Sequence, residues 1–136
     1  MQTLAEFRYA LRQFLHFSEQ RAAQAGLQPQ QHQLLLHIAG APEDAEATVS
    51  YMAEKLGLRH NSVVELSKRC EDAGLIFREQ SETDRRVVVL HLTPAGQRII
   101  RSLSEDHERE LSVHLPALMR SLSFIHKRTA QKVEAE

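Results

Sequence analysis

The stretch that decides the fold is VSYMAEKLGLRHNSVVELSKRCEDAGL, residues 49–75. Its apolar residues recur at the spacing of one helix face on both sides of Gly57, a residue that can take the left-handed conformation of a tight turn. Small Ala53, the glycine corner and branched Val63 form the packing signature of a helix-turn-helix. We therefore expect two short helices, the first capped by Ser50 and the second spanning about residues 60–73. The inward-facing residues are Met52, Ala53, Leu56, Leu58, Val63, Leu66 and Cys70.

A hairpin with a charged tip is expected directly after the second helix. Residues 75–80 (LIFREQ) and 87–92 (VVVLHL) have the composition of short strands, and the polar run SETDRR separates them. A hairpin in this position makes the unit a winged helix. Its tip carries Asp84, Arg85 and Arg86, where a loop that contacts a phosphate backbone or a minor groove would need them.

The flanking segments are expected to be helical. Residues 3–25 have one periodic apolar face and end at Gly26, and Pro29 opens another helix that ends near Gly40. Residues 42–47 (PEDAEA) are expected to form an exposed acidic loop without chemistry.

The last helical region starts with Thr93 as N-cap and continues to about residue 130. We expect Pro116 to break or kink it, with one helix to about Val113 and a second from about Leu115. Its apolar face is larger than one small domain needs. Together with residues 3–25 it is therefore the candidate dimer interface. We expect the whole chain, residues 1–136, to form a single domain whose winged-helix lobe spans about residues 28–93.

Composition excludes several classes of protein. A chain of 136 residues with a formal net charge of −1 gives no bulk attraction for nucleic acid, so any case for DNA binding rests on local pattern. One cysteine excludes an internal disulfide framework and a cysteine-cluster metal site. The N-terminus does not read as a signal peptide, and no apolar run reaches membrane-spanning length, so we expect a cytoplasmic protein with no membrane partner.

The order of these elements resembles the MarR family of bacterial transcriptional regulators. The residues that carry the resemblance are 27–31 (LQPQQ), 52–58 (MAEKLGL), 73–76 (AGLI), 84–86 (DRR) and 92–96 (LTPAG), and it covers roughly residues 3–128. It implies a homodimer with a winged helix-turn-helix, in which the second helix reads the major groove of a near-palindromic operator in double-stranded DNA. It also implies a repressor, and many members of the family release DNA when they bind a small aromatic acid or when a cysteine is oxidised. The family would place an effector in a cleft around His16, Phe17 and His37.

The DNA-reading surface is expected at the exposed face of the second helix. Asn61 suits adenine, Val64 suits a thymine methyl group, and Arg59 or His60 could reach a phosphate or guanine. Glu65 departs from the family pattern and would either accept from a cytosine amine or pair with Lys68 or Arg69. In the wing, the resemblance implies that Arg86 matters more for DNA binding than Arg85, and that Asp84 holds Arg86 in place. Arg85 would be the more exposed partner of a phosphate. The full candidate surface is Arg59, His60, Asn61, Ser62, Val64, Glu65, Lys68, Arg85 and Arg86.

Two other classes of function stay open. Between Arg59 and Arg86 bases and acids balance, which favours a winged-helix protein–protein interaction module that never touches DNA. A small enzyme or metal carrier lacks a motif, because the histidines do not have compact metal-ligand spacing and no catalytic set stands out. We therefore expect no enzyme activity, no cofactor and no metal. Cys70 is interpreted as a small buried apolar residue rather than a redox sensor.

Overall fold

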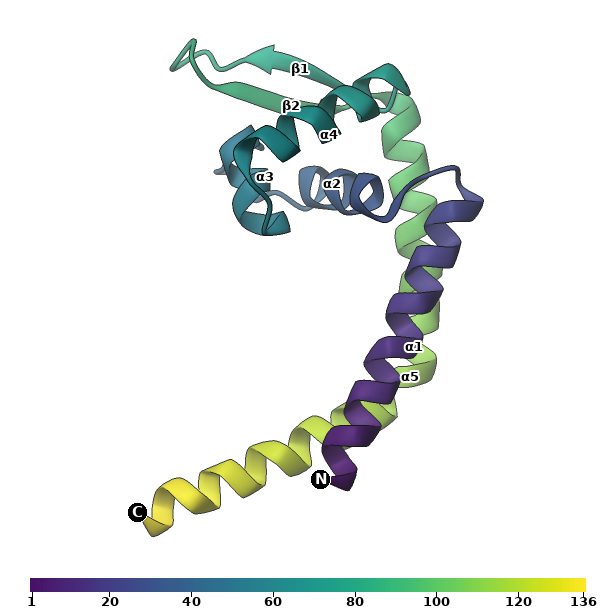
Figure 1. Ribbon diagram of the computed structural model, residues 1–136, viewed down its shortest axis with the longest axis vertical. Coiled ribbons are helices and arrows are strands. Elements are labelled where there is room, and N and C mark those ends of the chain that lie inside the picture. The colour runs from purple at the N-terminus through teal and green to yellow at the C-terminus, as the bar shows by residue number, and fades with distance from the viewer. The chain divides into compact units, whose positions relative to one another are not determined.

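The computed structural model describes residues 1–136 and divides into two compact units. Residues 1–21 and 104–136 form the terminal-helix unit, and residues 22–103 form the winged-helix unit. Figure 1 shows the elements in chain order. They are α1 (Gln2–Gln24), α2 (Pro29–Ala39), α3 (Val49–Leu56), α4 (His60–Asp72), β1 (Ile76–Gln80), β2 (Val88–Leu92) and α5 (Pro94–Ala135).

The core of the winged-helix unit lies where α2, α3 and α4 meet. Leu34 and Leu35 of α2, Met52 of α3 and Leu66 of α4 are completely buried there. The predicted apolar stripe of the second helix is confirmed, because Cys70 is also fully buried beside them. These contacts hold the three helices together and leave the opposite face of α4 in solvent.

The corner between α3 and α4 is the predicted glycine turn. Gly57 has φ 65° and ψ 34°, which is the left-handed conformation. The N–H of Leu58 donates to the carbonyl of Ala53 over 3.0 Å and closes the turn. The predicted N-cap Ser50 is wrong, because α3 begins earlier. Thr48 caps it instead, with its hydroxyl accepting from the N–H of Tyr51 at 3.0 Å.

The wing is an antiparallel hairpin in which Ile76 lies opposite Leu92 and Gln80 opposite Val88. The fold is therefore mainly helical with a small hairpin, as predicted. The expectation of a simple exposed loop at residues 42–47 is wrong at its end. Ala47 is buried, and its carbonyl accepts from the N–H of Leu90 over 2.8 Å, next to an isolated bridge between Thr48 and Val89.

The start of α5 is tied to the end of α4. The Thr93 hydroxyl donates to the carbonyl of Gly74 at 2.6 Å and accepts from the N–H of Gly96 at 3.1 Å. The Thr93 N–H donates to the carbonyl of Leu75 at 3.0 Å. A Cβ at Gly96 would overlap this same carbonyl group, so the backbones approach as closely as only glycine permits.

Polar contacts between α1 and α5 hold the terminal-helix unit. Arg21 donates to Asp106 over 2.5 Å, and this hydrogen bond lowers the pKa of the Asp106 carboxyl. The ring of His107 lies 2.7 Å from the Ser18 hydroxyl and packs edge-on against Phe17. No helix of the chain is both long enough and apolar enough to cross a membrane.

The expected division into two helices at Pro116 is wrong, whereas the alternative, a kink in one helix, agrees with the structure. Helix α5 continues through Pro116 to Ala135, although Figure 1 shows the helix changing direction in this half. Proline removes one helical hydrogen bond, and an exposed position such as this one lets water satisfy the released carbonyl.

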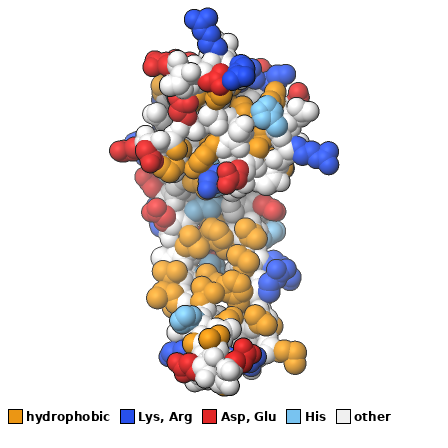
Figure 2. All heavy atoms as spheres, turned by 90° about the vertical axis from the view of Figure 1, so that its left-hand side faces the viewer, with side chains coloured by type: hydrophobic (Ala, Val, Ile, Leu, Met, Phe, Trp, Pro, Cys, Tyr) orange, Lys and Arg blue, Asp and Glu red, His pale blue; other side chains and the backbone are white.

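Large apolar side chains of this unit remain in solvent. Tyr9 on α1 and Met119 on α5 are about 60% exposed, and Leu4, Leu15, Leu122 and Phe124 are about half exposed. Figure 2 shows hydrophobic side chains gathered over one face of the terminal helices. An apolar patch of this kind is typical of a surface that associates with another protein surface.

Replacing Gly96 by alanine tests the close approach at the start of α5. We expect Gly96→Ala to lower the free energy of unfolding by about 2–3 kcal/mol, because the added methyl group meets rigid backbone. The matched control is Gly40→Ala, where φ is −92° and the expected change is within about 1 kcal/mol. Urea unfolding followed by circular dichroism measures both. An unchanged midpoint for Gly96→Ala would contradict the packing described.

Candidate nucleic-acid interface

The outer face of α4 is polar and open to solvent. Arg59 occupies the N-cap position without using its side chain as a cap, so its guanidinium is available for other contacts. Asn61 and Ser62 in the first turn are exposed, and Val64 is half-buried. In a DNA-binding helix-turn-helix, the N-terminal end of the second helix points at base edges. The predicted surface residues Arg59, His60, Asn61, Ser62, Glu65 and Lys68 are all exposed.

One acidic and one basic residue in the middle of α4 face each other. Lys68 Nζ lies 3.6 Å from Glu65 Oε1, one helical turn away, and both side chains are more than half exposed. An exposed pair of this kind contributes little stability. It partly neutralises Glu65, which would otherwise repel a phosphate. Arg69 is engaged elsewhere and donates to the side chain of Gln28 over 2.9 Å.

The tip of the wing is organised by Asp84. Its carboxylate accepts from the backbone N–H of Arg86 at 3.0 Å, and from the Arg86 guanidinium at 3.2 and 3.3 Å. These hydrogen bonds from Arg86 lower the pKa of the Asp84 carboxyl, so it stays ionised to a lower pH than usual. The Arg86 side chain is 91% exposed despite the pair. Arg85 is exposed as well and has no ion-pair partner.

A small cleft joins the start of α4 to the base of the wing. It has a volume of about 140 Å³, and His60, Val64 and Arg86 all line it. The structure therefore brings together residues that the sequence placed in separate motifs. It adds Arg78 and Ser50, which sequence reasoning missed. Strand alternation could have identified Arg78, because it shares a strand face with buried Ile76.

The three residues of the predicted effector cleft belong to different units. His16 and Phe17 lie on α1 in the terminal-helix unit, and His37 lies on α2 in the winged-helix unit. His16 is exposed, whereas Phe17 is half-buried with its ring centroid 5.4 Å from that of His107. The effector cleft stays a prediction.

Cys70 is buried in the core rather than displayed on the surface. Its side chain is fully covered, and this burial raises the pKa of the thiol to about 11, with a smaller opposing effect from Arg69. The thiolate is the reactive form of cysteine. The environment therefore suits a packing residue, in agreement with the interpretation from the sequence.

Comparison with known families matches this region directly. The model of the MarR family matches residues 25–87. The uncharacterised HTH-type transcriptional regulator YfiV of Bacillus subtilis is 39% identical over 70 residues, covering 52% of this chain and 44% of its own length. A putative transcriptional regulatory protein for the hcr operon of Thauera aromatica is 29% identical over 92 residues, covering 68% of this chain and 54% of its own. The chain thus spans about half the length of the curated relatives it matches.

Solved structures share the fold over almost the whole chain. AbsC, a MarR family transcriptional regulator from Streptomyces coelicolor, has a TM-score of 0.71 at 22% identity, covering 94% of this chain and 89% of its own. S. aureus MepR bound to an oligodeoxyribonucleotide has a TM-score of 0.68 at 19% identity, covering 95% and 93%. CouR from Rhodococcus jostii bound to p-coumaroyl-CoA also has 0.68, at 18% identity, covering 89% and 83%.

Thiol labelling tests the environment of Cys70. At pH 7.5 we expect iodoacetamide to modify the native protein at least about 100-fold more slowly than the urea-unfolded chain, because the raised pKa and burial both remove accessible thiolate. Mass spectrometry of quenched samples gives the two rates. Rapid, complete labelling of the native protein would mean that Cys70 is exposed and a candidate redox group after all.

Proposed function

We propose that the protein is a regulator of the MarR family that binds double-stranded DNA and regulates transcription, because the model of that family matches residues 25–87 and a curated transcriptional regulator is 39% identical over 70 residues. The observation that carries the proposal is the cleft that joins α4 to the wing. It brings Arg86, a basic residue of the hairpin tip that is 91% exposed, beside the first turns of a helix whose outer face is polar and uncovered. A helix in the major groove and a basic loop beside it fit the geometry of duplex DNA.

Within this proposal, α4 reads bases and the wing holds the backbone. Asn61 would pair with adenine and Val64 would contact a thymine methyl group, since both lie in the first turns of the helix. Arg85 and Arg86 would contact phosphates, and Asp84 would orient Arg86. The Glu65–Lys68 pair leaves little surplus charge on α4, so affinity would depend strongly on the wing.

We also propose that two copies of the chain act together as a repressor of a near-palindromic operator. The exposed apolar residues of α1 and α5 support a homodimer through the terminal-helix unit. Two recognition helices would then enter successive major grooves about 34 Å apart. Release by a small aromatic effector is part of the proposal. It is supported by the neighbour CouR, which was solved with p-coumaroyl-CoA, and the candidate residues are His16, Phe17 and His37.

A second candidate function is a winged-helix module that binds another protein. The observation in its favour is the pairing of charges on the proposed interface, where Glu65 meets Lys68 and Asp84 meets Arg86. Retention of a specific duplex by the purified protein at moderate salt separates the two functions. The following two variants test the DNA-binding proposal residue by residue.

Asn61→Ala tests base reading. We expect this variant to keep its fold and change which operator bases are tolerated, because the side-chain amide that pairs with adenine is gone. The cost at the cognate base should be about 1–3 kcal/mol. Competition binding against single-base operator variants provides the measurement. The same base preference as the unmodified protein would remove Asn61 from the reading surface.

Arg86→Ala tests the wing. We expect weaker binding to all duplexes by about the same factor, and a salt dependence whose slope is reduced by about 1, because one phosphate contact is lost. Arg101→Ala is the control, since it removes an equally charged, exposed side chain outside α4 and the wing. Fluorescence anisotropy at several salt concentrations gives affinity and slope together. If both are unchanged, the wing does not contact DNA.

A further inference from the structure

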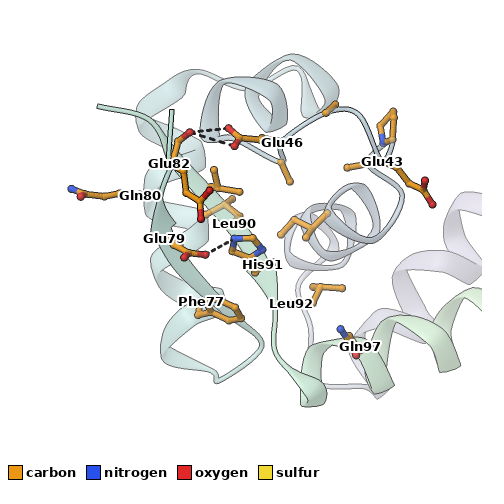
Figure 3. Close-up of a pocket in the computed structure, with 17 residues that line it drawn as sticks. Glu43, Glu46, Phe77, Glu79, Gln80, Glu82, Leu90, His91, Leu92 and Gln97 are labelled. Atoms are coloured by element: carbon orange, nitrogen blue, oxygen red, sulfur yellow. Dashed lines mark hydrogen bonds and ion pairs between the residues drawn. The ribbon is translucent and has the colours of Figure 1, made fainter. Parts of the chain in front are cut away.

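A second and larger cleft lies between the hairpin and the segment that joins α2 to α3. Its volume is about 600 Å³, within the range of small-molecule sites. Figure 3 shows it bounded by Phe77 and Glu79 of β1, His91 of β2 and Glu46 of the joining segment. None of its lining residues lines the smaller cleft beside α4. Because side chains alternate along a strand, Phe77 and Glu79 point to one side of β1 and Arg78 to the other.

The charge of this cleft has one sign. Four glutamates line it and no lysine or arginine does. Glu43 turns its carboxylate outward in Figure 3, which leaves Glu46, Glu79 and Glu82 around the opening. No lysine or arginine side chain lines the cleft to balance these three carboxylates. A cation that entered the cleft would therefore be attracted by all three together.

The neighbours of these carboxylates do not cancel their charge. Glu46 accepts hydrogen bonds from the neutral hydroxyl of Ser81 at 3.1 and 3.3 Å. Glu79 Oε2 lies 3.0 Å from His91 Nε2, and a neutral imidazole can donate there without compensating the charge. Glu82 is exposed and has no ion-pair partner. A cationic ligand would supply what the protein does not.

The apolar part of the lining indicates what else the ligand must have. The Phe77 side chain is 46% exposed and stacks on the His91 ring, with centroids 4.9 Å apart and planes at 21°. Leu90, Leu92 and Ile38 of α2 also line the cleft and add to its apolar surface. No group of three metal-ligating side chains occurs in the chain, so the carboxylates do not form a compact cage for a bare ion. A flat apolar body with an ammonium or amidinium group matches both parts.

We propose that this cleft is a binding site for a small organic cation with an aromatic or aliphatic body. The cation lies against Glu46 and Glu79, and the body stacks on Phe77. The site is distinct from the α4–wing surface and from the residues of the predicted effector cleft. Its test needs no DNA, so it stands or falls independently of the proposed function.

The experiment is a titration of the full chain with three naphthalene probes of matched size and different charge. They are 1-naphthylmethylamine, 1-naphthalenemethanol and 1-naphthoate. The protein has no tryptophan, so naphthalene fluorescence can be followed directly, with calorimetry for stoichiometry. We expect saturable binding of the amine with one site per chain, at least about tenfold weaker binding of the alcohol, and weaker binding still of the naphthoate.

Three variants within the cleft and one control outside it locate the site. Glu46→Gln and Glu79→Gln keep side-chain size, and each should weaken amine binding by about tenfold while leaving the alcohol unchanged. Glu71→Gln removes an exposed carboxylate outside the cleft and should leave amine affinity unchanged. Thermal unfolding checks that each variant is folded, and Phe77→Leu gives a second, uncharged test through loss of ring stacking.

Several outcomes would overturn the proposal. One is no saturable binding of the amine, and another is equal affinity for the amine and the naphthoate. A third is unchanged amine affinity in both Glu46→Gln and Glu79→Gln in folded protein. Binding of an oligoarginine peptide without binding of the amine would instead assign the surface to a basic protein segment.

Discussion

Burial of the inner side of α4 determines what the outer side can do. Val63, Leu66 and Cys70 are fully covered by α2 and α3, which fixes the rotation of the helix about its axis. Asn61 and Lys68 must then face solvent, since they lie opposite the buried positions on the helical wheel. The Gly57 corner sets where the helix begins. The proposed DNA-reading surface depends on this packing, because a rotated α4 would present a different set of side chains.

Residues of the hairpin line two separate clefts, because successive side chains of a strand point to opposite sides. One side of β1 carries Arg78 toward the α4 cleft, and the other carries Phe77 and Glu79 toward the acidic cleft. The hairpin is anchored by Ala47, whose carbonyl receives the Leu90 N–H, so both clefts share one support. A basic surface for phosphates and an acidic surface for cations can thus coexist on a chain of formal net charge −1.

Much of the fold follows from patterns that act locally. Helix periodicity, the Gly57 corner and the hairpin composition predicted the winged helix, because each reflects short-range constraints on the backbone. Contacts between segments that are distant in the sequence could not be predicted from these local patterns. The pairing of Ala47 with Leu90, and the meeting of Arg78 with the α4 surface, join residues with no sequence signal between them. The continuous helix at Pro116 shows tertiary and solvent context overriding a local preference.

We propose that the polar face of α4 and the Arg86 wing read duplex DNA in two symmetric copies. Selection of bound duplexes from a random pool by the purified chain tests it most directly. The account predicts a near-palindromic consensus whose half-sites repeat at one helical turn, about 10–10.5 base pairs centre to centre. Recovery of no enriched sequence at moderate salt would contradict it, and an enriched sequence without twofold symmetry would contradict the paired arrangement.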